Sequence, residues 1–181
     1  MAHLPRNLRH CPGLTAAVLL TAAVAFAQPV ARVTVGSPVL TMTPDLEVPV
    51  PINVNAPGGG LLHVEIEIAY PAKLLKYVEA KPGSVVERAK GKVRVEGKAG
   101  NAAAGEQVLA IAVESPEPLT AGTLVTLWFQ PTEAVTGRTE IPLRTLSRSA
   151  KSAAGEEIEP QGADGKITLM PIVFSCFFYM H

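Results

Sequence analysis

The chain has 181 residues, with 16 basic and 16 acidic side chains, so its formal net charge is zero. This balance excludes the basic excess by which nucleic-acid-binding proteins attract phosphates. The length fits a single domain that is large enough to bury its own core, preceded by a short leader.

The first 27 residues have the three parts of a secretory signal peptide. Arg6 and Arg9 precede the apolar run 14–26, and Ala25 and Ala27 supply an Ala-x-Ala cleavage site. A membrane anchor is the alternative, but this run is well short of the roughly 20 residues that span a bilayer as a helix. We therefore expect an exported protein, located in the periplasm, on the cell surface or outside the cell.

The mature chain expected after cleavage begins near Gln28. It keeps 14 basic residues against 16 acidic ones, because Arg6 and Arg9 leave with the leader, and its formal charge is −2. Only Cys176 would remain, so no intrachain disulfide is expected. His63 would be the only histidine within the body of the domain, which leaves no Cys/His metal site. We expect neither a metal nor a cofactor.

Short strand candidates, separated by turn residues, follow one another along the mature chain, and no helical period persists for more than two turns. They are Arg32–Gly36, Leu46–Asn55, Leu61–Tyr70, Tyr77–Ala80, Lys92–Glu96, Gln107–Glu114, Leu124–Gln130, Thr139–Thr145 and Gly165–Leu169. Nine strands at this spacing predict an all-β fold of the sandwich type over residues 28–169.

The strand 61–70 shows the clearest alternation. One face is expected to be buried and carries Leu62, Val64, Ile66, Ile68 and Tyr70, while the other carries His63, Glu65, Glu67 and Ala69. A strand with one polar face is typical of an antiparallel sheet with one side in water. The strand 46–55 and the strand 124–130 likewise carry apolar residues on one face, which predicts two sheets packed face to face.

Several local motifs follow one another along the mature chain. They are Glu47-Val48-Pro49-Val50-Pro51-Ile52, a Gly-rich turn, Tyr70-Pro71 with Leu74-Leu75, Lys81-Pro82-Gly83-Ser84-Val85, 121–129 and Asp164-Gly165-Lys166-Ile167-Thr168. The order of these motifs resembles the cohesin family. The similarity covers roughly residues 31–169. It implies a nine-stranded jelly-roll sandwich, related to carbohydrate-binding modules, that binds dockerin modules on a flat sheet face.

The resemblance also implies where a partner would bind. Mapped by strand order, the binding face would include His63, Glu65, Glu67, Arg94, Glu96 and Arg144. The expected partner is a dockerin-like module or another envelope protein, and the domain would act as a non-catalytic recognition or scaffold module.

Other functions compete with this interpretation. Glu65 and Glu67 would lie about 7 Å apart, within the range of glycosidase carboxylate pairs, but on a solvated face where nothing raises a carboxyl pKa. Polysaccharide binding would use exposed aromatic rings, for which Trp128 and Tyr77 are the candidates. A structural envelope or secretion component with the same fold is a further alternative.

The last twelve residues, 170–181, form an apolar tail that includes three of the five phenylalanines. The tail is too short to span a membrane. If exposed, an apolar segment with a free thiol would favour aggregation.

Overall fold

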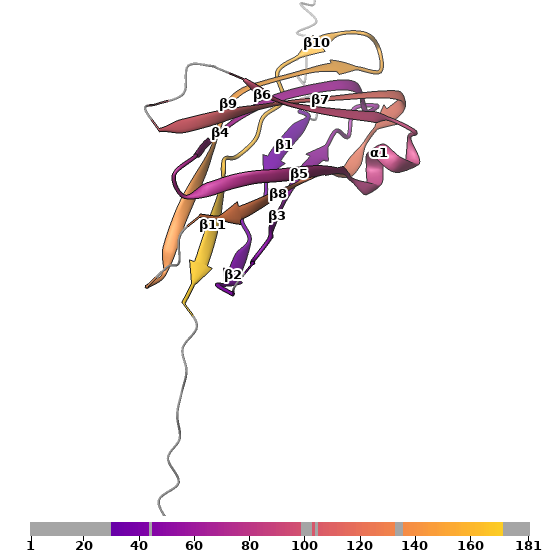
Figure 1. Cartoon of the computed structure of the whole chain (residues 1–181). Helices are drawn as coiled ribbons and strands as arrows, with labels where there is room; N and C mark the ends of the chain where they lie inside the picture. The colour runs from indigo at the N-terminus through magenta and orange to yellow at the C-terminus, as the bar shows by residue number, and fades with distance from the viewer. Residues whose placement is uncertain (1–29, 44, 99–102, 104, 133–135, 172–181) are drawn as a thin grey trace, which may run out of the picture.

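Two β-sheets pack face to face in the computed structural model, which describes residues 30–43, 45–98, 103, 105–132 and 136–171 (Figure 1). The smaller sheet has the order β1 (Arg32–Val35), β3 (Val48–Asn55), β8 (Ala121–Pro131) and β5 (Leu75–Pro82). The larger sheet has the order β2 (Val39–Thr41), β11 (Gly165–Met170), β9 (Thr139–Ser152), β4 (Leu61–Pro71), β7 (Glu106–Leu119) and β6 (Lys92–Lys98), and β10 (Glu157–Ile158) pairs with β9. The helix α1 (Ser84–Arg88) connects β5 to β6.

The all-β sandwich is confirmed, and each of the nine predicted strands corresponds to an observed one. The predicted count of nine is not confirmed, because the described residues form eleven strands. The two additional strands are β2, with three residues, and β10, with two. Strands this short show no period in the sequence, and only their backbone pairing defines them, that of β2 with β11 and that of β10 with β9. Among the described residues, no helix is long and apolar enough to cross a membrane.

The core lies between the two sheets, as the alternating apolar residues predict. Val125, Leu127 and Phe129 of β8 are fully buried. Tyr70 of β4 meets Phe129 edge to face, with ring centroids 5.2 Å apart, so the larger and smaller sheets contact each other through aromatic rings.

The register of β4 corrects one detail of the predicted alternation. Its pairing with both neighbouring strands shifts between Leu61 and His63. Leu62 is the extra residue of a bulge relative to β9, whereas the additional residues relative to β7 are 115–118 on β7 itself. Leu61 is therefore buried, at 1% exposure, and Leu62 is only half-buried. From His63 onward the predicted alternation is correct, although Ala69 on the outer side is also buried.

Residues 161–163 lie beside β1 and extend the smaller sheet. The backbone N–H of Val33 donates to the carbonyl oxygen of Gln161 at 2.7 Å, and that of Val35 donates to Ala163 at 3.2 Å. Gly162 lies between these two bonds, and a Cβ atom there would be 1.7 Å from the carbonyl oxygen of Val33. The close approach of the two backbones therefore requires a glycine.

Candidate functional site

The outer face of β4, β6, β7 and β9 gathers charged side chains in rows across the larger sheet. The residues on β4 and β6 share partners on β7: Glu65 and Arg94 both pair with Ala112, and Glu67 and Glu96 both pair with Ala110. Side chains on directly opposite residues of an antiparallel pair point to the same face. The structure thus places Glu65, Glu67, Arg94 and Glu96, four of the six expected partner-binding residues, around one stretch of β7. We call this surface the charged face.

A hollow of about 250 Å³ lies at the centre of the charged face. Ala110 and Ala112 of β7 form part of its floor because their methyl groups are shorter than the side chains on either side. The walls are built by β4 and β6, and residues from β9 and the end of β6 complete the rim. The lining residues outside β7 are Glu65, Ile66, Glu67, Arg94, Glu96, Lys98 and Ser147.

The β4 wall of the hollow is held by two side-chain contacts. The ammonium of Lys98 donates a hydrogen bond of 2.5 Å to Glu67 Oε1, and this bond lowers the pKa of the Glu67 carboxyl below its usual value. His63, a fifth expected partner-binding residue, contacts the same wall, since its Nε2 lies 3.1 Å from Glu65 Oε1. Fixed side chains give this wall a defined charge pattern.

The β6 wall carries two charges without such contacts. Arg94 and Glu96 are exposed, and neither makes a salt bridge within the part of the chain that the structure describes. They stand two residues apart on an edge strand, with opposite signs. Their charges are therefore open to another molecule.

Arg144, the sixth expected residue, lies on the charged face but away from the hollow. Its guanidinium donates two hydrogen bonds to the Glu106 carboxylate, at 2.5 and 3.2 Å. The contact lowers the pKa of Glu106 and raises that of Arg144. Arg144 is therefore already occupied by an intramolecular partner and borders the site without lining it.

Sequence reasoning missed four contributors to the hollow: Ala110, Ala112, Lys98 and Ser147. The two alanines had a visible signal, since they alternate with Leu109, Ile111 and Val113 on the predicted strand 107–114. Small residues at outward positions mark a depression only when longer neighbours flank them, and those neighbours come from other strands. Lys98 and Ser147 lay beyond the predicted ends of their strands.

The two candidates for a carbohydrate site do not share a surface. Tyr77 pairs with Phe129 on the core side of the smaller sheet, with ring centroids 6.0 Å apart, and burial raises the pKa of its hydroxyl. Trp128 is on the opposite side, where the Lys81 ammonium lies 4.9 Å from its ring centroid. The indole Nε1 is buried, so it is not offered at the surface. The two rings therefore lie on opposite sides of the smaller sheet, and a sugar site at Trp128 stays a prediction.

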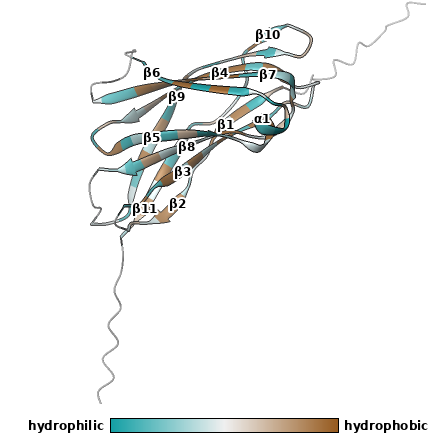
Figure 2. Cartoon of the chain, turned by 45° about the vertical axis from the view of Figure 1, so that its right-hand side comes forward, coloured by the Kyte–Doolittle hydropathy of each residue, from teal (hydrophilic) through white to brown (hydrophobic). Residues whose placement is uncertain are grey.

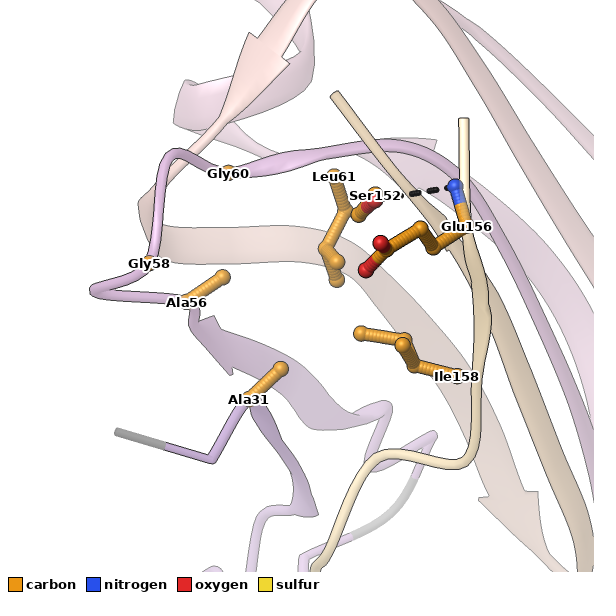
Figure 3. Close-up of a pocket in the computed structure, with 8 residues that line it drawn as sticks. All are labelled: Ala31, Ala56, Gly58, Gly60, Leu61, Ser152, Glu156 and Ile158. Atoms are coloured by element: carbon orange, nitrogen blue, oxygen red, sulfur yellow. Dashed lines mark hydrogen bonds between the residues drawn. The ribbon is translucent and has the colours of Figure 1, made fainter. Parts of the chain in front are cut away.

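A second concave site lies at one end of the sandwich, between the turn after β3 and the hairpin of β9 and β10 (Figure 3). Its volume is about 410 Å³, and Ala31, Ala56, Leu61 and Ile158 make most of it apolar. The Glu156 carboxylate points into this space, and the backbone N–H of Glu156 donates to Ser152 Oγ at 3.1 Å. The lining includes a single ionisable group, so it offers no acid and base pair.

The residues that the structure describes contain no cluster of side chains that could bind a metal ion. No group of three or more His, Cys, Asp or Glu side chains there converges in a way that could hold an ion. Two carboxylates of the charged face, Glu67 and Glu106, already accept hydrogen bonds from the basic side chains of Lys98 and Arg144.

The sandwich is similar to solved cohesin structures. A non-cellulosomal cohesin from the archaeon Archaeoglobus fulgidus matches with a TM-score of 0.61 and 12% identity, over 78% of this chain and 92% of that one. The cohesin of a type I cohesin–dockerin complex from Clostridium thermocellum matches with a TM-score of 0.64 and 19% identity, over 78% of this chain and 100% of that one. The third cohesin ScaC of Acetivibrio cellulolyticus, in complex with the ScaB dockerin, matches with a TM-score of 0.63 and 19% identity, over 77% of this chain and 99% of that one.

Sequence comparison alone finds no relatives: no family model matches the chain, and no curated protein does. The structural matches nevertheless span nearly the whole length of the cohesins concerned. The chain therefore has a cohesin-like fold, as the order of its local motifs predicts.

Proposed function

We propose that this chain is an exported, non-catalytic recognition module that uses its cohesin-like fold to bind a dockerin-type protein partner on the charged face. The hollow over Ala110 and Ala112 is the observation that carries the proposal, because a flat sheet face with a central depression fits a protruding element of another protein. Solved neighbours that are themselves bound to dockerins support the choice of partner.

The charge pattern fits a protein better than a small molecule. The hollow has a volume of about 250 Å³ and is partly open to solvent, whereas small-molecule sites are clefts of about 300–1,000 Å³ that bury most of their ligand. Around it, Glu67 and Lys98 are held against each other, and Arg94 and Glu96 have opposite signs. Mixed charges on a flat surface fix the register of a partner and speed its encounter, and they add modest affinity.

The state of the carboxylates argues against hydrolysis. A glycosidase acid needs a raised pKa, yet the hydrogen bond from Lys98 lowers the pKa of Glu67. Glu65 beside it is 59% exposed, so no apolar pocket surrounds it. We expect no turnover when the protein is incubated with a panel of glycans and esters. A measurable hydrolysis that Glu67→Gln abolishes would contradict the non-catalytic role.

The experiment that tests the proposed partner is a titration of dockerin modules encoded in the same genome against the immobilised protein. Glu67→Lys should weaken binding and lower the melting temperature only slightly, through the loss of its exposed contact with Lys98. Raised salt should weaken binding of the unchanged protein. Trp128→Ala is the matched control on the opposite sheet and should leave binding unchanged.

The same titration also decides the main alternative. If Trp128→Ala removed binding to a polysaccharide panel, while Glu67→Lys had no effect on any ligand, a carbohydrate-binding function would replace the proposed one. Binding that is indifferent to both changes would place the partner on neither sheet face.

A further inference from the structure

The strand β6 leaves one edge of the larger sheet open. Among the described strands it pairs with β7 alone, over seven residues and without a register shift. The other sheet edges are shorter or interrupted: β2 has three residues, β1 has four, and β5 shifts register between Tyr77 and Glu79. An uninterrupted edge presents a row of N–H and C=O groups that another strand can pair with.

The side chains of β6 form a self-complementary pattern about Val95. Arg94 and Glu96 flank this residue on the outer side, where both are exposed. Val93 and Val95 are half-buried on the inner side, so part of their apolar surface still meets water. Figure 2 shows hydrophilic and hydrophobic residues alternating along β6 at this side of the sandwich.

We propose that a second copy of the chain pairs with this edge, β6 against β6, antiparallel about a two-fold axis at Val95. In this arrangement Arg94 of each copy lies directly opposite Glu96 of the other, which gives two opposite-charge pairs. A two-fold interface needs a surface that is complementary to itself, and an Arg and a Glu placed symmetrically about one residue meet that condition.

The extent of pairing favours this register over its neighbours. A slip by one residue would turn outward side chains inward, so only slips by two keep both outer faces on the same side. A slip by two centres the pairing on Arg94, where Lys92 meets Glu96 but Arg94 meets Arg94, or on Glu96, where Glu96 meets Glu96 and Arg94 meets Lys98. Either slip leaves two of the seven residues of each strand unpaired and puts two like charges directly opposite each other at its centre.

The ends of the paired strands tolerate the proposed register. Lys92 would lie opposite Lys98 of the second copy, but each has an acidic neighbour in its own chain. Lys98 is hydrogen-bonded to Glu67, and Lys92 pairs across the sheet with Glu114 of β7. The seven residues of both strands overlap completely in this register, which covers the half-buried Val93 and Val95.

Such a dimer would place two charged faces side by side on one continuous sheet. A partner with two binding elements could then engage both copies at once, which raises avidity without any new contact. The inference does not depend on the partner proposed above, because the pairing of β6 is measured on the protein alone.

The test is the dissociation constant of the dimer, measured by analytical ultracentrifugation of the full chain without any partner. Arg94→Glu should weaken the dimer about tenfold or more, since it turns both opposite-charge pairs into like-charge pairs. Glu96→Arg should do the same. Lys151→Glu, on β9 and distant from the edge, is a control with the same change of charge as Arg94→Glu and should leave the dimer unchanged.

Mixing the two variants gives the sharpest outcome. Arg94→Glu and Glu96→Arg chains should form a heterodimer with each other, because every pair across the axis is again one acid and one base. The double variant Arg94→Glu/Glu96→Arg should regain the homodimer. A monomer at all concentrations, or a dimer that neither single change weakens, would overturn the proposal.

Discussion

Truncating Ile66 tests whether β4 turns its apolar face to the core. Ile66 is 1% exposed and lies opposite Ile111 of β7 in the middle of the larger sheet. Ile66→Ala removes three carbon groups, and at about 0.8 kcal/mol for each the lost burial amounts to about 2.4 kcal/mol. The cavity left behind adds to this, so we expect a total loss of about 2–5 kcal/mol.

The neighbouring residue provides the control for this prediction. Glu65 points to the opposite side of the same strand, and Glu65→Ala should change the free energy of unfolding by no more than about 0.5 kcal/mol. Urea unfolding of both variants, followed by circular dichroism, gives the two values with the slope of the transition as a check. Small and equal effects at Ile66 and Glu65 would refute the assignment of faces on β4.

Two further predictions concern backbone packing and pH. Gly162→Ala should destabilise the protein by about 1–3 kcal/mol or more, because the added Cβ meets a main-chain oxygen of β1. Gly97 has open space around it, so Gly97→Ala is the control and should cost about 1 kcal/mol or less. Thermal melts of both variants measure the difference. The folded-state pKa of Glu67 is lowered by Lys98, so their contact stabilises the fold above the unfolded pKa of the carboxyl, and this contribution is lost as the pH falls through the folded pKa. Lys98→Met should therefore lower the urea midpoint at pH 7, but not at an acid pH where the Glu67 carboxyl is protonated. An equal loss of urea midpoint at both pH values would contradict a stabilising ion pair.

The parts of the fold that alternate strictly in sequence could be predicted. The nine main strands and the inward faces of β3 and β8 depend on a period of two that each segment carries by itself. The same reasoning placed Glu65 and Glu67 on outward positions, and strand order taken from the cohesin resemblance added Arg94 and Glu96 to the same face. The register shift at Leu62 could not be predicted, because it depends on how β4 pairs with β7 and β9.

The parts that depend on neighbours in space were missed. Tyr77 has no sequence feature that distinguishes a core side chain from an exposed one, and its contact with Phe129 becomes visible only once β5 pairs with β8. The depth of the hollow likewise arises from Ala110 and Ala112 lying between longer side chains of other strands. The predicted leader 1–27 and nearly all of the apolar tail 170–181 lie outside the described residues, apart from Met170, which ends β11, and Pro171.

Partner binding on the charged face is tested most directly by an amide hydrogen-exchange footprint of the protein with and without a bound dockerin module. We expect binding to slow exchange on β4, β6 and β7, around Glu67, Arg94 and Ala110, while β3 and β8 exchange as they do in the free protein. Protection confined to β3, β5 and β8, around Trp128, would contradict the assignment of the charged face as the binding surface.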